Sequence, residues 1–306
     1  MVAFLVRRLF GAMLVLAGVT VAVFLILHLT GDPALIMLPP DASPQDVITF
    51  RHEYGFDRPA YVQFADFAAH AVRGDFGNSI RHGMPAMSLA LERLPATGEL
   101  AFSALVLAIL IALPAGIIAA MRRETPLDYA VRMISLVGQA APVYWLGIML
   151  ILIFGVALGW FPISGIGGWN HLVLPMITLG AFTTAKLMRI TRSGMLDVAR
   201  LDYVRTATAK GLSPLRVVID HTLRNAILPI VTVIGLELGT LLSGAVITET
   251  IFSWPGIGRL AVQAIYDRDY PVVEAIVVLT ATIFVGLNLL VDLTYLIVDP
   301  RVRHAA

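Results

Sequence analysis

The sequence predicts an all-α integral membrane protein with six transmembrane helices. Of its 306 residues, 58% are hydrophobic and only 14% are charged, whereas a soluble protein carries about 25% charged residues. A core of this size cannot hide so much apolar surface from water, so much of it must face lipid. Six long apolar segments follow one another along the chain. Because backbone groups in lipid must be hydrogen-bonded internally, each segment is expected to be a helix.

The first three apolar segments cover residues 10–29, 100–121 and 133–161. Arg7 and Arg8 precede the first one, as basic residues do in a signal peptide. Its roughly 20 residues nevertheless match a membrane span, whereas the apolar part of a signal peptide has about 7–15. We therefore expect a retained helix. The second and third segments carry no charge, and the third is long enough to tilt in the bilayer.

The last three segments each contain or approach a charged residue. The fourth starts near Leu172 and reaches Lys186 after about 14 residues, so it is either short or its basic end extends towards the interface. The fifth covers residues 226–247 and contains Glu237. The sixth covers residues 272–298 and contains Glu274 and Asp292.

The placement of basic residues predicts the orientation. They gather before the first segment, between the second and third, between residues 187 and 224, and after the last. With six spans these four regions share one side, which the positive-inside rule makes cytoplasmic, together with both termini. The predicted organisation is an N-terminal transmembrane helix (1–30), an extracytoplasmic loop or cap with short helices (31–96) and a core membrane domain (97–300). The core includes a cytoplasmic loop over residues 187–224.

This cytoplasmic loop carries signals for two short helices. Asp202 is suited to N-cap a helix that begins at Tyr203, and Gly211 is suited to the position just after that helix. Ser213 and Pro214 are typical of the N-cap and first residue of a second helix. We interpret the pair as a projection that docks into a groove on a soluble partner. The alternative is a basic loop that only sets the topology.

Acidic residues inside the apolar segments are candidates for function. Glu237 lies in the middle of the fifth segment, where a charge is costly unless it faces protein or water. It either lines a translocation path or makes a structural hydrogen bond to a neighbouring helix. Asp292 and Asn288 are further candidates for lining, although a polar contact between helices is favoured for them. Three more ionisable residues are expected near the interfaces and in contact with water: His28, Glu249 and Glu274.

No catalytic signature is present in the sequence. It lacks the GxxxxGK[ST] phosphate loop, HExxH and GxSxG, which mark nucleotide-hydrolysing, zinc-dependent and serine-dependent sites. It also lacks cysteine, and its histidines are scattered. We therefore expect no catalytic residue, metal site or cofactor in this chain, and no nucleic-acid partner. A membrane enzyme is disfavoured for the same reason.

Residues 202–214 (DYVRTATAKGLSP) resemble the cytoplasmic EAA loop of permease subunits from binding-protein-dependent ABC importers. More narrowly, the chain is similar to the B-type subunit of the dipeptide/oligopeptide and nickel permease group. Supporting stretches occur in order through most of the chain: GDP (31–33), YGFDRP (54–59), GDFGNS (74–79), LRNAILP (223–229), ETIFSWPGIGR (249–259), DRDYP (267–271) and DPR (299–301).

The loop departs from the general pattern, which is Glu-Ala-Ala, three residues, Gly, nine residues and Ile-x-Leu-Pro. Arg205 and Thr206 stand where the Glu and the first Ala would be, while Ala207 and Gly211 are retained. Pro229 lies farther from the glycine than the general pattern has it, as in the peptide-permease branch. Contacts that depend on the missing glutamate are therefore not carried over.

The resemblance implies a type I ABC importer permease fold in a bacterial inner membrane. It implies that ATP and Mg bind to partner subunits, either two ATP-binding subunits or one as a homodimer. A C-type permease subunit and an extracytoplasmic substrate-binding protein would complete the complex within membrane lipid. The coupling to the ATPases is assigned to Tyr203, Arg205, Ala207, Ala209, Lys210, Gly211, Leu212, Ser213, Pro214 and Leu215.

An alternative function is an ATP-independent secondary transporter or channel that relays protons through Glu237 and Asp292. Such folds usually contain internal repeats, and none is evident here. Within the importer interpretation the solute stays open. A dipeptide, a longer peptide, glutathione or a nickel complex each fits this subunit type.

Overall fold

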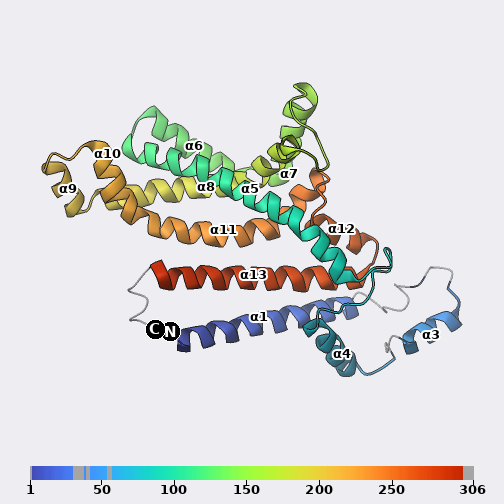
Figure 1. Ribbon diagram of the computed structural model, residues 1–306. Coiled ribbons are helices and arrows are strands. Elements are labelled where there is room, and N and C mark those ends of the chain that lie inside the picture. Colours follow the sequence, from blue (N-terminus) through green and yellow to red (C-terminus); the bar gives the residue numbers. More distant parts are fainter. Residues whose placement is uncertain (1, 30–37, 39–41, 54–56, 299–306) are drawn as a thin grey trace. The chain divides into compact units, whose positions relative to one another are not determined.

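The computed structural model describes residues 2–29, 38, 42–53 and 57–298, and their regular structure is helical (Figure 1). Two of the resembling stretches, residues 31–33 and 299–301, and the start of a third, 54–56, lie outside the described residues. The α-helices are α1 (Val2–Leu29), α3 (Pro44–Glu53), α4 (Ala60–Val72), α5 (Ala86–Met121), α6 (Pro126–Ala140), α7 (Val143–Leu150), α8 (Trp169–Ala199), α9 (Asp202–Ala209), α10 (Pro214–Arg216), α11 (Arg224–Ile251), α12 (Ile257–Tyr266) and α13 (Tyr270–Val298). Two π-helical stretches, Ile151–Ala157 and Val217–Leu223, follow α7 and α10.

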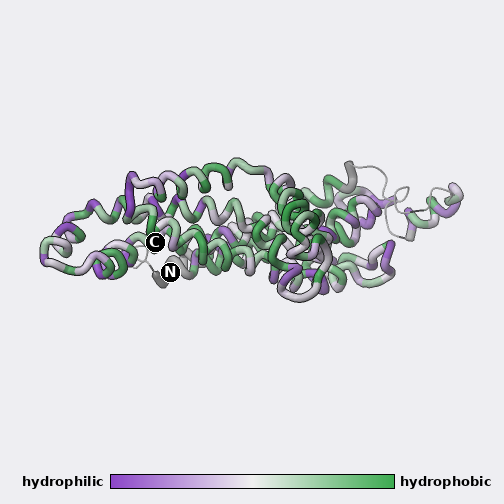
Figure 2. The backbone as a smooth tube through the Cα atoms, turned by 90° about the horizontal axis from the view of Figure 1, so that it is seen from above, coloured by the Kyte–Doolittle hydropathy of each residue, from purple (hydrophilic) through white to green (hydrophobic). Residues whose placement is uncertain are grey.

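Among the described residues, five helices are long and apolar enough to cross a membrane: α1, α5, α8, α11 and α13. A sixth crossing results if α6 and α7, with the π-helical stretch that follows, form one bent span. Figure 2 shows hydrophobic residues over much of the helical chain. The predicted all-helical membrane fold is therefore confirmed, and the count of six holds with one span broken.

The prediction of one helix over residues 133–161 was wrong. The two helices on either side of the break at Ala141 and Pro142 are bent by 106°. Proline lacks an amide hydrogen and disfavours helical geometry at the residue before it. Ala141 is accordingly extended, with φ −69° and ψ 126°, and α7 begins immediately after Pro142.

The fourth apolar segment belongs to a helix that is much longer than the sequence indicated. α8 continues for 31 residues through Ala199, well beyond Lys186. Its basic residues do not end it, because acidic side chains from α11 and α6 pair with Lys186 and Arg192. The turn that leads to α9 therefore begins only at about residue 200.

The chain divides into two compact units, one of residues 1–95 with 256–289 and one of residues 96–255 with 290–305. In the first unit, Phe24 of α1 packs against Phe64 and Phe67 of α4, with ring centroids 5.3 and 6.0 Å apart. The two short helices α3 and α4 agree with the predicted helical content of the 31–96 segment. Phe67 also packs against an apolar cluster that joins α5, α12 and α13 through Leu89, Leu260 and Val272.

A polar clasp in the first unit joins two stretches that are 190 residues apart. Ser79 Oγ donates to Asp269 Oδ2 over 2.5 Å, and the backbone amides of Ile80 and Arg81 also donate to this carboxylate. Asp269 has 2% exposure. Ser79 belongs to the GDFGNS stretch and Asp269 to the DRDYP stretch, so the clasp joins two of the resembling motifs. Beside it lies a cavity of about 320 Å³ lined by Arg81, His82, Gln263 and Tyr266, among others.

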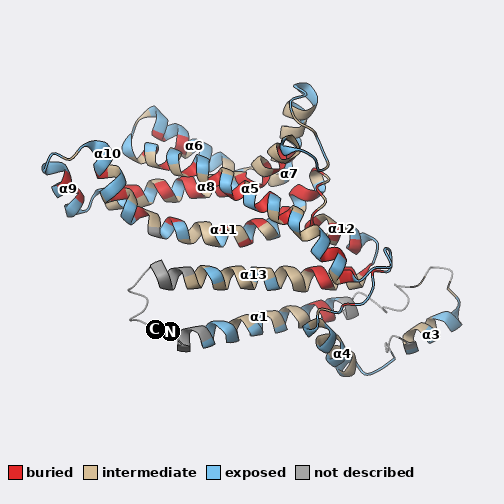
Figure 3. Cartoon of the chain, in the orientation of Figure 1, coloured by how far each residue is buried: buried red, intermediate tan, exposed pale blue. Residues whose placement is uncertain are grey.

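The second unit is built around α8, which is packed by α5, α6, α7 and α11 (Figure 1). Figure 3 shows buried residues along much of its length. Helices can approach closely here because small residues lie at the contacts. A methyl group added at Gly180 would lie 2.9 Å from the carbonyl oxygen of Ala104 on α5, so this position requires glycine.

Candidate functional site

The turn between α8 and α11 contains the α9–α10 segment, residues 202–216. α9 is amphipathic, with Val204 and Ala207 buried on one side. Both pack with Val217 at the start of the π-helical stretch, and Val198 and Leu212 cover this cluster. A small apolar core of its own therefore holds the segment in place.

Gly211 ends α9 as predicted. It has a φ of +80°, in the left-handed region that favours glycine. Its amide donates to the Thr208 carbonyl over 3.0 Å, and the Leu212 amide donates to the Ala207 carbonyl over 3.4 Å. This pair of bonds is a Schellman motif. Leu212 also packs against the apolar cluster that contains Ala207, so the turn is specified both by backbone geometry and by packing.

The predicted N-caps are only partly present. Asp202 is the first residue of α9 rather than its cap, since Leu201 takes the cap position, and the Asp202 side chain is 98% exposed. Ser213 does take the N-cap position of α10, with Pro214 as its first residue. No side-chain cap bond forms at either helix. Proline geometry and the Gly211 turn therefore specify this segment more than capping does.

Tyr203 connects α9 to the beginning of α11. Its hydroxyl donates to the His221 carbonyl over 3.2 Å and accepts from Asn225 Nδ2 over 2.7 Å. The same Asn225 amide donates to the His221 carbonyl. The sequence singled out Tyr203 as part of the loop but gave no indication of these partners, because they lie 18 and 22 residues away.

The outer face of the α9–α10 segment is open. Leu215 is 64% exposed although it is apolar. Arg205 approaches Asp202 only to 3.8 Å, and both side chains are largely in solvent. Such an exposed ion pair contributes little to the stability of the fold. The remaining residues assigned to this loop from the sequence are exposed as well: Ala209, Lys210, Gly211, Ser213 and Pro214. The segment thus has one face fixed to the unit and one face free to contact another molecule.

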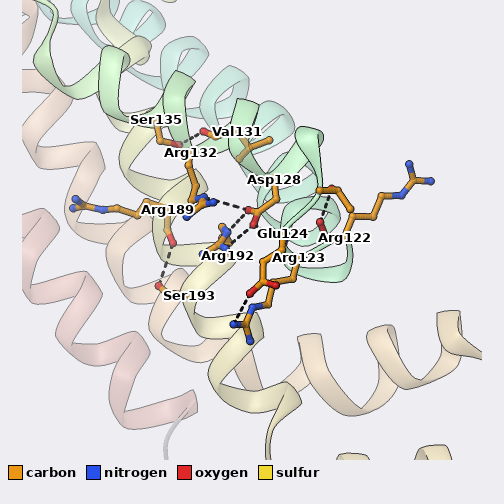
Figure 4. Close-up of polar contacts among 11 residues, drawn as sticks. Arg122, Arg123, Glu124, Asp128, Val131, Arg132, Ser135, Arg189, Arg192 and Ser193 are labelled. Atoms are coloured by element: carbon orange, nitrogen blue, oxygen red, sulfur yellow. Dashed lines mark hydrogen bonds and ion pairs between the residues drawn. The ribbon is translucent and has the colours of Figure 1, made fainter.

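A buried carboxylate at the contact between α6 and α8 was not predicted. Asp128, on the first turn of α6, is bound at two points by Arg192 of α8, with Nε to Oδ1 at 2.5 Å and Nη2 to Oδ2 at 2.8 Å (Figure 4). The Glu124 amide donates to the same carboxylate over 3.0 Å. Arg132 lies 3.8 Å away and stacks over the Tyr129 ring. The only sequence signal was an acid among the arginines of this turn.

Glu237, a candidate for pathway lining, is buried between α11 and α8 with 1% exposure. Its two carboxylate oxygens accept from Lys186 Nζ over 2.5 Å and from Thr183 Oγ1 over 2.8 Å. The contacts that the structural interpretation requires are therefore present. A role in the pathway stays a prediction for this residue.

The other polar candidates differ in burial. Asp292 and Asn288 are half-buried and one turn apart on α13. Glu274 is half-buried too, while the side chain of His28 lies outside the described residues. The expectation that Glu249 contacts water was wrong. Its side chain has 0% exposure and accepts from Thr97 Oγ1 over 2.5 Å, because the end of α11 is packed against α5 there.

Two family models match the chain. Residues 112–304 match the binding-protein-dependent transport system inner membrane component, and residues 1–101 match the N-terminal part of membrane components of the same systems. The chain is 40% identical to an oligopeptide transport system permease protein, AppB, of Bacillus subtilis (strain 168), over 99% of this chain and 100% of that protein.

Two further relatives cover nearly the whole chain. It is 41% identical to a di/tripeptide transport system permease protein, DppB, of Pseudomonas aeruginosa (strain UCBPP-PA14), over 99% of each chain. It is also 41% identical to a glutathione transport system permease protein, GsiC, of Escherichia coli (strain K12), over 99% of this chain and 100% of that one.

Solved structures share the fold. A chain of the MetNI methionine ABC transporter, in inward-facing conformations, aligns with a TM-score of 0.59 at 19% identity, covering 70% of this chain and 97% of that one. A chain of an amino acid ABC transporter crystallised with histidines aligns with a TM-score of 0.55 at 17% identity, covering 68% and 92%. At these identities the likeness concerns the fold alone.

Proposed function

Because this chain belongs to the family of binding-protein-dependent transport system inner membrane components, we propose that it forms half of the solute pathway of an ATP-driven importer for peptides or related small solutes. It is a multi-pass protein of the bacterial inner membrane. The peptide class is supported by relatives at 40–41% identity, whose names refer to transport systems for oligopeptides, di/tripeptides and glutathione.

The α9–α10 segment is proposed to transmit the movement of the ATPase subunits. The observation that carries this proposal is its division into two faces. Val204, Ala207 and Leu212 anchor it to the unit, while Leu215 and Lys210 project outwards. A short helix with an exposed face can bind in a groove on a soluble partner. We therefore propose that the segment and both termini lie on the cytoplasmic side, in agreement with the positive-inside rule.

The proposed complex contains a C-type permease subunit, two ATP-binding subunits or a homodimer of one, and an extracytoplasmic substrate-binding protein. ATP and Mg would bind to the ATPase subunits. The family's description names binding-protein dependence and the inner membrane, which supports such an assembly.

The proposal is tested by uptake into proteoliposomes that contain the full complex and the binding protein. Gly211→Trp should uncouple ATP hydrolysis from uptake while the protein still inserts. Gly74→Trp is a matched control, because Gly74 also has a positive φ (+72°) and no neighbouring atom within 4 Å of an added Cβ. Unchanged uptake in Gly211→Trp would remove the coupling assignment.

The secondary-transporter alternative needs Glu237 to exchange protons with a water path. In this structure the carboxylate is instead paired with Lys186 and Thr183. Uptake that follows a proton gradient and ignores ATP would favour this alternative over the importer.

A further inference from the structure

The exposed face of α8 carries basic and polar residues at regular helical spacing. Phe182 is 43% exposed and Lys186 is 36% exposed, and Arg189 and Ser193 are exposed as well. Their spacing of four, three and four residues places these four on one side of the helix, and we call them the α8 stripe. By contrast, the exposed residues in the middle of α5 are apolar, for example Val106 and Leu110.

Arg189 differs from the other two basic residues of α8 nearby. Lys186 is paired with Glu237, and Arg192 is paired with Asp128. In the part of the chain that the structure describes, no acidic side chain lies within 4 Å of the Arg189 guanidinium. Figure 4 shows Arg192 pointing towards Asp128 and Arg189 pointing away from it. Asp197, one turn past Ser193, is exposed on the same side and makes no ion pair with Arg189.

A face with this composition is not suited to lipid. Lys186 precedes the predicted cytoplasmic segment 187–224, and a charged side chain within a membrane-spanning helix is costly in lipid and faces a bundle interior or a water-filled path instead. Arg189 and Ser193 continue the same face towards the predicted cytoplasmic end. The other sides of α8 are covered by α5, α6, α7 and α11 of the same unit. The α8 stripe is therefore the part of this central helix left for water, solute or another subunit.

We propose that the α8 stripe lines the solute pathway and that Arg189 binds the carboxylate of the solute as it passes. This inference rests on the proposed function of the chain as an importer permease. A guanidinium offers paired donors that match a carboxylate at two points. Because Glu237 balances the charge of Lys186, the pair adds no net charge. Among the described residues, Arg189 is then the basic residue of the stripe that has no acidic side chain within 4 Å, and the terminal carboxylate of a peptide would supply that partner.

The absence of cysteine from the chain allows a direct test. In the complete complex in nanodiscs, Phe182→Cys reports on the stripe, and Leu110→Cys on α5, 65% exposed, is the matched apolar control. Each is treated with an anionic thiosulfonate carrying a sulfonate and with a cationic one carrying a quaternary ammonium. The Phe182→Cys thiol should react with both reagents and more quickly with the anionic one. The Leu110→Cys thiol should stay unreactive, because a thiolate does not form in lipid.

The charge of Arg189 is then varied in the Phe182→Cys background. Arg189 lies two helical turns from Phe182, so Arg189→Gln should lower the anionic-to-cationic rate ratio about fourfold. Arg189→Lys should largely restore it. Arg123→Gln, which removes an exposed charge paired with Glu124, should leave the ratio unchanged.

Three results would overturn the inference. A Phe182→Cys thiol that is unreactive with and without ATP would show that lipid or a partner subunit covers the stripe. A ratio that does not respond to Arg189→Gln would remove the anion site. A ratio that falls when phosphatidylglycerol is added to zwitterionic nanodiscs would assign Arg189 to a lipid phosphate. Failure of the proposed function gives a different signature, since the complex would then show no ATP-driven uptake of alanyl-alanine, whatever the labelling.

Discussion

Arg192 and Asp128 form a two-point ion pair that joins α8 to the first turn of α6, with the carboxylate fully buried and the arginine side chain 19% exposed. Removing one partner leaves the other charge buried without compensation, which costs more than the pair itself contributes. The pair is therefore a point at which the second unit is sensitive to a single substitution.

Asp128→Asn should lower the free energy of unfolding by about 3 kcal/mol, since Arg192 would lose its counter-charge in a buried position. Unfolding of the purified protein in mixed micelles with increasing sodium dodecyl sulfate measures this. Glu124→Gln is the control, because its ion pair with Arg123 is exposed, and an exposed pair contributes less than about 1 kcal/mol. Equal losses in the two variants would contradict the assignment.

Glu237→Gln should also lower the free energy of unfolding, by about 1–2 kcal/mol. We expect a smaller loss than for Asp128→Asn because Lys186 is partly in contact with solvent. The double variant Glu237→Gln/Lys186→Met removes both charges and should recover part of the loss. A double-mutant cycle in the same unfolding assay measures this interaction. If the two single effects simply add, Lys186 and Glu237 do not interact in the folded protein.

Leu215→Glu should weaken association with the ATPase subunits at least about tenfold, because a charge replaces an apolar side chain on the free face of the α9–α10 segment. The affinity is measured by co-purification and by binding of the isolated ATPase subunits to the immobilised membrane complex. The stability of the chain itself should hardly change. Ile265→Glu on α12 is the control, because Ile265 has a similar exposure of 62%. The complex with this variant is expected to bind the ATPase subunits normally.

Asp269→Asn should loosen the clasp with Ser79, because a neutral amide is a weaker acceptor for the hydroxyl and the two backbone amides. Hydrogen exchange over residues 77–86 should become faster by about tenfold, which corresponds to about 1.4 kcal/mol. Asp267→Asn, which removes only the partly exposed pair with Arg81, should leave this segment largely protected. Fast exchange in both variants would mean that the carboxylate of Asp269 has no special role.

The elements that depend on local chemistry were predictable from the sequence. Apolar length indicated the membrane helices, and Gly211 and Pro214 indicated where α9 ends and α10 begins. The break before Pro142 was also a local signal, but the uninterrupted apolar composition around it concealed the bend. Long-range contacts were not predictable. Asp128 and Arg192 are 64 residues apart, and the burial of Glu249 depends on Thr97, 152 residues away.

Two cross-links between neighbouring elements have a mechanical consequence. The contact between Tyr203 and Asn225 ties α9, which follows α8 after two residues, to the beginning of α11. Farther along, Lys186 and Glu237 tie α8 to α11 again. Two helices that are connected at two points along their length resist sliding past each other. We therefore expect a displacement of α9 to move α8 and α11 together, because sliding of one helix along the other would break the ion pair between Lys186 and Glu237.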